Sequence, residues 1–170
     1  ERLTAEFSVE KVDEIHSFDD YLRLEDELFA QLEEAVYAHT ATGPEYALLR
    51  YSAGSAADPR RRQPNWNRSF ELPVGTPRGG VLLLHGMSDS PYSLRSIGEL
   101  LHDRGAYVIG MRVPGHGQAP SGLLDTEWED MAAAVRLAVS ELEDKSTGVP
   151  LYIVGYSNGG ALAVQYTLHS

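Results

Sequence analysis

From residue 69 onward, short apolar blocks alternate with longer amphipathic stretches. The block from Val81 to Leu84 has no polar residue, which is typical of a parallel strand covered on both faces. The pattern predicts four strands, at Ser69–Val74, Val81–Leu84, Ala106–Met111 and Leu151–Val154. It also predicts three helices, over residues 91–104, from Thr126 onward, and over residues 161–169. Strands and helices that alternate in this way indicate a parallel α/β sheet.

Local start and stop signals support two of these helices. Ser90 is a predicted N-cap, with Pro91 in the first helical position and Gly105 as the stop. Thr126 is the predicted N-cap of the next helix, and Glu129, three residues later, completes a predicted capping box.

The first 68 residues follow a different pattern. An apolar residue recurs there at helical spacing, at Tyr21, Leu24, Leu28, Leu32 and Val36. We predict an amphipathic helix over residues 18–39 with Ser17 as its N-cap. Residues 52–67 have no sustained period and are predicted to form a loop. The chain therefore divides into an N-terminal extension, residues 1–68, and an α/β part, residues 69–170.

Composition and charge narrow the class of protein. Of the 170 residues, 42% are apolar and 23% charged, as expected for a folded globular chain, and no apolar stretch approaches the roughly 20 residues of a transmembrane helix. The net charge of -11 argues against nucleic acid as a partner. Residues 1–34 hold 12 acidic and three basic residues, a net -9, so the acidity belongs to the extension. The absence of cysteine excludes disulfides, thiolate metal sites and a cysteine nucleophile.

The strongest chemical motif lies between the last strand and the last helix. Gly155, Ser157 and Gly159 form a Gly-x-Ser-x-Gly sequence there. A serine on such an abrupt turn is held with its hydroxyl above the sheet, and its neighbours two positions away must be small because strand and helix nearly touch. The helix N-terminus favours negative charge, so the backbone N–H of Asn158 is a candidate oxyanion donor.

A second donor is expected from the loop after the neighbouring strand, where His85-Gly86-Met87 directly follows Leu84. A phosphate-binding turn is the alternative for Ser157. Neither a Gly-x-x-x-x-Gly-Lys nor a Gly-x-Gly-x-x-Gly pattern supports that alternative. The side chain of His85 is expected to brace the loop, with only the backbone beyond it taking part in chemistry.

Residues 69–170 resemble the α/β-hydrolase superfamily, and specifically the bacterial carboxylesterase and monoacylglycerol-lipase-like serine hydrolases. The resemblance rests on three segments, Leu82–Gly86, Pro114–Gly117 and Val154–Gly160. It implies that Ser157 attacks an ester carbonyl and that the backbone N–H groups of Met87 and Asn158 hold the oxyanion. It also implies that Pro114–Gly117 is structural. The expected fold is the N-terminal part of an α/β-hydrolase fold, a mostly parallel sheet flanked by helices, preceded by the acidic helical extension.

The sequence departs from the family in its triad. Members supply an acid and then a histidine after the serine, whereas only His169 follows Ser157 here, about 18 Å away along a helix at 1.5 Å per residue. In the family's strand order, Leu151–Val154 lies mid-sheet, and ending there would leave an open apolar edge. We therefore expect residues 69–170 to be an incomplete hydrolase domain, completed by a remainder that carries the acid and histidine.

The resulting hypothesis is a serine hydrolase that acts on carboxylic or lipid esters by acyl transfer, with no cofactor or metal implied. One alternative is a binding or scaffold protein that has lost catalysis on the same fold. Another is an acyltransferase or peptidase with the same machinery.

Arg60-Arg61-Arg62 is interpreted as a solvated loop rather than an anion site. The acidic helix is expected to lay its apolar side on the domain and leave its charges in water, although covering the site or docking a partner are alternatives.

Overall fold

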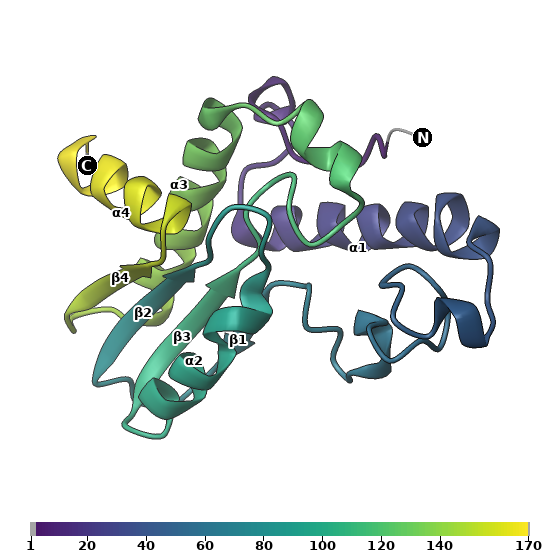
Figure 1. Ribbon diagram of the computed structural model, residues 1–170. Helices are drawn as coiled ribbons and strands as arrows, with labels where there is room; N and C mark the ends of the chain where they lie inside the picture. The colour runs from purple at the N-terminus through teal and green to yellow at the C-terminus, as the bar shows by residue number, and fades with distance from the viewer. Residues whose placement is uncertain (1–2, 170) are drawn as a thin grey trace.

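A four-stranded sheet forms the centre of the molecule (Figure 1), as seen in a computed structural model that describes residues 3–169. Its strands are β1 (Phe70–Leu72), β2 (Gly79–Leu84), β3 (Ala106–Met111) and β4 (Leu151–Gly155), in the spatial order β1-β3-β2-β4. The neighbours β3, β2 and β4 are parallel, and β1 pairs antiparallel with β3. The sheet is therefore mostly parallel, as predicted, and β3 has the predicted bounds.

Helices cover both faces of the sheet, and the side chains of β2 and β3 alternate between two apolar clusters. Leu82, Leu84 and Ile109 pack with α3 (Trp128–Lys145) and with Leu162 of α4 (Asn158–His169). Val81, Leu83 and Val108 form a second cluster on the other face. There Gly98 of α2 (Arg95–His102) lies against the side chains of Leu83 and Val108. Every residue of β2 is buried, which confirms the prediction from its unbroken apolar sequence.

β4 differs from β2 in its surroundings. Its residues are exposed or half-buried, and among the described residues it pairs on one side only, with β2. β4 is thus an open edge among the described strands, as expected for residues 69–170 on their own. Within residues 3–169, every helix is too short or too polar to span a membrane.

Three predicted helix starts are wrong. A 3-10 helix, Pro91–Leu94, precedes α2, and the hydroxyl of Ser90 caps neither of them. The N-cap of α3 is Glu127, which forms a capping box with Asp130. Thr126 lies one residue before that cap, and its hydroxyl donates to the carbonyl of Gly122 at 2.7 Å. The last helix begins directly after Ser157, at Asn158, and not at residue 161.

The N-terminal extension contributes to the main core. Its long helix, α1 (Phe18–Ala35), starts at Ser17 with a capping box to Asp20, as the cap signal predicted. It stops four residues before the predicted end, and a 3-10 helix, Tyr37–His39, follows. Phe18 and Tyr21 lie in the same apolar cluster as the α3 side chains. The remaining single-turn 3-10 helices are Val9–Lys11, Pro44–Tyr46, Pro59–Arg61 and Pro120–Leu124.

The interpretation of Arg60-Arg61-Arg62 as a solvated loop fails for Arg60. Its guanidinium pairs with Asp58 at 2.8 Å and with Glu33 at 2.5 Å. It also lies 3.6 Å from the centre of the Tyr37 ring. Arg60 therefore joins the loop to the end of α1, since a cation over an aromatic face is attracted by the ring quadrupole.

Candidate active site at the β4 to α4 turn

Ser157 lies on the turn between the end of β4 and the start of α4. Its φ of 54° is in the left-handed region, which is strained for a residue with a side chain. Its side chain is exposed. The Gly-x-Ser-x-Gly sequence thus sits on an abrupt strand-to-helix turn, with the serine accessible to solvent.

The two glycines of the motif are where backbones approach most closely. A Cβ on Gly155 would collide with the carbonyl group of Gly159, and a Cβ on Gly159 would collide with the carbonyl of Leu84 and approach the His85 oxygen at 2.7 Å. These neighbours are backbone atoms, so they cannot move aside by changing rotamer. Gly155 and Gly159 therefore meet a steric need that the motif predicts.

The His85-Gly86-Met87 turn lies beside Ser157. A Cβ on Gly86 would lie 3.5 Å from the Cβ of Ser157 and 2.9 Å from the Tyr156 ring. The N–H of Tyr156 donates to the carbonyl of Leu84 at 3.0 Å, which extends the β2–β4 pairing up to the turn. The structure thus brings the two predicted donor segments together, because both follow the carboxyl ends of adjacent parallel strands.

The side chain of His85 braces this turn, as expected. The N–H of Val113 donates to Nε2 of His85 at 3.0 Å, so Nδ1 carries the proton and donates to the carbonyl of Gly86 at 2.9 Å. Burial lowers the pKa of His85 to about 4, and its hydrogen bond to Gly86 offsets only part of that effect. His85 is therefore neutral at pH 7, with both ring nitrogens occupied by structural hydrogen bonds.

The two predicted oxyanion donors are Asn158, which directly follows Ser157, and Met87, which belongs to the turn beside it. Asn158 is the first residue of α4, so its N–H has no partner one turn earlier in the helix. Its side-chain amide lies 3.5 Å from the sulfur of Met131 and points into the protein. Met87 follows Gly86 and has a side chain that is half exposed.

Three further histidines of the described chain make side-chain hydrogen bonds to backbone carbonyls. His169 lies at the far end of α4, where its ring donates to the carbonyl of Gln165. His102 contacts the carbonyl of Pro73 at the opposite end of the sheet. His116 is buried, with Nδ1 on the carbonyl of Pro114, and its ring packs 5.1 Å from that of His85. None of these three provides a base for Ser157.

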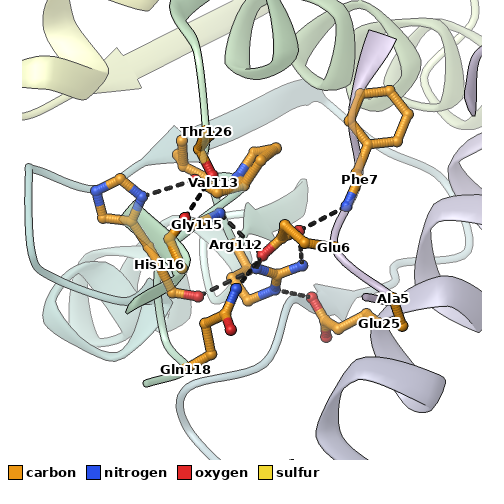
Figure 2. A network of polar contacts seen from close by, with 12 residues as sticks. Ala5, Glu6, Phe7, Glu25, Arg112, Val113, Gly115, His116, Gln118 and Thr126 are labelled. Carbon is orange, nitrogen blue, oxygen red and sulfur yellow. Dashed lines mark hydrogen bonds and ion pairs between the residues drawn. The ribbon is translucent and has the colours of Figure 1, made fainter. Parts of the chain in front are cut away.

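A second polar centre, which sequence analysis missed, surrounds Arg112, the residue after β3 (Figure 2). Arg112 is 1% exposed and donates to both oxygens of Glu6, at 2.8 and 3.0 Å, and to Glu25 at 3.0 Å. Burial favours a higher pKa for Glu6, but the charge and hydrogen bonds of Arg112 outweigh it and lower the pKa. For Glu25 the effect of burial is larger than the opposing effects of Arg112 and Ser69, so the pKa of Glu25 is raised.

The expectation that the acidic helix leaves its charges in water is therefore wrong for Glu25, and Glu6, which precedes the helix, also pairs with Arg112. Two signals could have pointed to the Arg112 centre. Glu25 interrupts the apolar side of the helix between Tyr21 and Leu28, and Arg112 is a charge placed directly after a fully apolar strand. Glu6 has no such signal, since nothing local distinguishes it from its acidic neighbours.

The mostly parallel sheet, the helices on both of its faces and the glycine-flanked serine between β4 and α4 define the class of protein as an α/β-hydrolase. Residues 75–170 match the family model described as serine aminopeptidase, S33. This match covers more than half of the chain, and the chain belongs to this lipase- and esterase-like α/β-hydrolase family.

Individual relatives agree with this class. A thermostable monoacylglycerol lipase of Bacillus sp. (strain H-257) is 30% identical over 90 residues, which are 53% of this chain and 35% of the relative. A probable alcohol acetyltransferase of Saccharomyces cerevisiae is 31% identical over 97 residues, 55% of this chain and 27% of the relative. A solved structure from a study of the metagenome-derived lipolytic enzymes LipS and LipT has a TM-score of 0.53 at 33% identity, covering 58% of this chain and 39% of that one. The chain thus aligns with about a third of the length of these proteins.

Proposed function

We propose that this chain carries the nucleophile and the oxyanion donors of a serine hydrolase that cleaves carboxylic or lipid esters. The observation that carries the proposal is the exposed Ser157 with its left-handed φ of 54°, packed beside the Gly86 turn. A strained serine between two closely approaching backbones is the geometry that presents an Oγ to substrate. The lipolytic relatives support esters as the substrate class.

In the proposed reaction, the Oγ of Ser157 attacks the ester carbonyl carbon while its proton passes to a histidine. The tetrahedral oxyanion accepts hydrogen bonds from the N–H groups of Met87 and Asn158. Collapse expels the alcohol, which takes the proton from the histidine, and leaves an acyl-Ser157. Water, activated by the same histidine, then releases the carboxylic acid. His85, His102, His116 and His169 are engaged in other hydrogen bonds, and we propose that the histidine and its acid lie outside residues 1–170.

Covalent labelling of the full-length protein with a fluorophosphonate tests this assignment. We expect labelling of the native protein and none of Ser157→Ala. Ser88→Ala is the matched control, because Ser88 is also exposed and has a φ of 58°; it should still be labelled. Labelling of Ser157→Ala would reject Ser157 as the nucleophile, and an unlabelled native protein would favour a non-catalytic scaffold on this fold.

Transfer of the acyl group to an alcohol is a second candidate, and the match to a probable alcohol acetyltransferase favours it. The acyl-Ser157 is common to both reactions, and only the acceptor differs. Adding ethanol to an acetyl-ester assay and measuring ethyl acetate against acetate separates them. Ethyl acetate as the main product would identify a transferase, whereas acetate alone would identify a hydrolase.

A further inference from the structure

Glu6 is aimed from the N-terminal segment into the loop that follows β3 (Figure 2). Besides Arg112, its carboxylate accepts the N–H of Gly115 at 2.9 Å and the side-chain amide of Gln118 at 2.5 Å. Only the N–H of Phe7 comes from its own segment, at 2.8 Å. The carboxylate of Glu6 therefore accepts nearly all of its hydrogen bonds from the loop and from Arg112, which directly precedes the loop.

The loop over residues 113–118 depends on such outside partners. All of its residues are buried, and Gly115 and Gly117 have φ values of 81° and 71°. Arg112 also donates to the carbonyl of His116 at 3.1 Å, so the guanidinium and Glu6 hold the loop from the inside. Buried backbone groups in irregular structure need partners of this kind, since leaving one without a hydrogen bond costs free energy.

The loop in turn touches the turn beside Ser157. The N–H of Val113, the first loop residue, donates to Nε2 of His85. Nδ1 of the same ring donates to the carbonyl of Gly86. This carbonyl belongs to the same peptide unit as the N–H of Met87. A short chain of hydrogen bonds therefore connects Glu6 with the Met87 peptide through Arg112, residues 113–118 and His85.

We propose that Glu6 is a positioning residue for the Met87 N–H, acting through residues 113–118 and the His85 ring. This inference rests on the proposed function, because it concerns the donor assigned there. An oxyanion donor contributes only if it is held at the point where charge develops, so a small displacement of Gly86–Met87 lowers the rate of the chemical step more than it weakens substrate binding. The acidic extension would then support catalysis from outside the α/β part of the chain.

The test is Glu6→Gln in the full-length protein, with Glu10→Gln as the matched control. Glu10 lies on the same segment but is exposed. Hydrogen exchange measured by mass spectrometry follows residues 84–90 and 113–118, and hydrolysis of a chromogenic short-chain ester gives kcat and KM. We expect Glu6→Gln to exchange faster in both segments and to lose about tenfold in kcat, with KM within about twofold, since removing a whole oxyanion donor costs about 10² to 10³. Glu10→Gln should match the native protein.

Glu6→Asp is the second variant, for the case that Glu6→Gln does not fold. It keeps the charge beside Arg112 but is one methylene shorter, so it should show a smaller loss of kcat in the same direction. An active native enzyme in which the Glu6 variants leave kcat and the exchange of residues 84–90 unchanged would overturn the positioning role alone. A native protein with neither labelling nor ester hydrolysis would instead overturn the proposed function.

Discussion

The Ser157 turn and the Arg112 centre both follow the carboxyl end of a parallel strand, but they are built in opposite ways. Ser157 is exposed and held at an unfavourable φ. Arg112 is 1% exposed, and its guanidinium donates to two carboxylates and a carbonyl. A group whose hydrogen bonds are all made within the protein has none to offer a substrate. The two sites differ in exposure and unused hydrogen-bonding capacity more than in position on the sheet, and these properties would distinguish a reactive serine from a structural arginine.

The largest expected effect sharpens this contrast at the serine. Ser157→Ala in the full-length protein should lower kcat for ester hydrolysis by about a million-fold, equivalent to about 8 kcal/mol of barrier, because the nucleophile is lost. Its free energy of unfolding should change by less than about 0.5 kcal/mol, because the side chain is exposed and alanine has a similar cost at this φ. Enzyme assays and urea unfolding measure the two quantities. A large loss of stability would contradict the assignment of Ser157 as purely functional.

The reverse pattern is expected at the arginine. Arg112→Met leaves Glu6 and Glu25 buried without their cation and should lower the free energy of unfolding by about 3–5 kcal/mol. Arg23→Met is the control, because the side chain of Arg23 is 72% exposed and pairs with Asp20 on the helix surface. That variant should lose less than about 0.5 kcal/mol. If urea unfolding gave the same loss of unfolding free energy for Arg112→Met and Arg23→Met, burial of Arg112 would have no energetic consequence.

The His85 brace predicts a pH dependence of stability. The pKa of His85 is lowered to about 4 in the folded protein, from an ordinary value of 6.5. Between these values the unfolded chain binds more protons, so stability is fully present above about pH 6.5 and is lost as the pH falls toward 4, by up to about 3 kcal/mol.

Other groups titrate in the same range, so the measured quantity is the difference between the native protein and His85→Asn. Unfolding free energies at pH 7 and pH 4.5 should differ less in His85→Asn than in the native protein. His39→Gln, at an exposed site, should keep the native slope. An unchanged slope in His85→Asn would refute the link to His85.

The smallest expected effect concerns backbone strain. Ser157→Gly should raise the free energy of unfolding by about 0.5–1 kcal/mol, because glycine adopts a positive φ without the Cβ penalty. Ser140→Gly, at an exposed position within α3, should lower it by about 0.5 kcal/mol through poorer helix propensity. Thermal or urea unfolding measures both changes in the free energy of unfolding. Changes of opposite sign would confirm strain at the serine turn, and a decrease in both variants would argue against it.

Local pattern predicted the strands better than the helix starts. The bounds of β3 are the predicted ones, because its apolar run ends at the charged residue Arg112. The predicted start of α3 was one residue too early, because Glu127 and Asp130 form the capping box while the hydroxyl of Thr126 donates back to Gly122. Which residue caps a helix depends on which of several nearby partners each side chain binds. The spacing of residues along the sequence does not specify that partner.

The sequence by itself determined that a serine flanked by glycines follows a buried strand and precedes a helix, because these are short-range properties of neighbouring residues. It also determined that β2 is covered on both faces, since only such a strand is apolar throughout. Only the tertiary structure decided that Gly86 packs beside Ser157 and that Glu6 reaches Arg112, 106 residues further along the chain. Contacts at that separation depend on how the elements pack together, and a buried acid and a solvated acid look alike until the fold brings a partner to one of them.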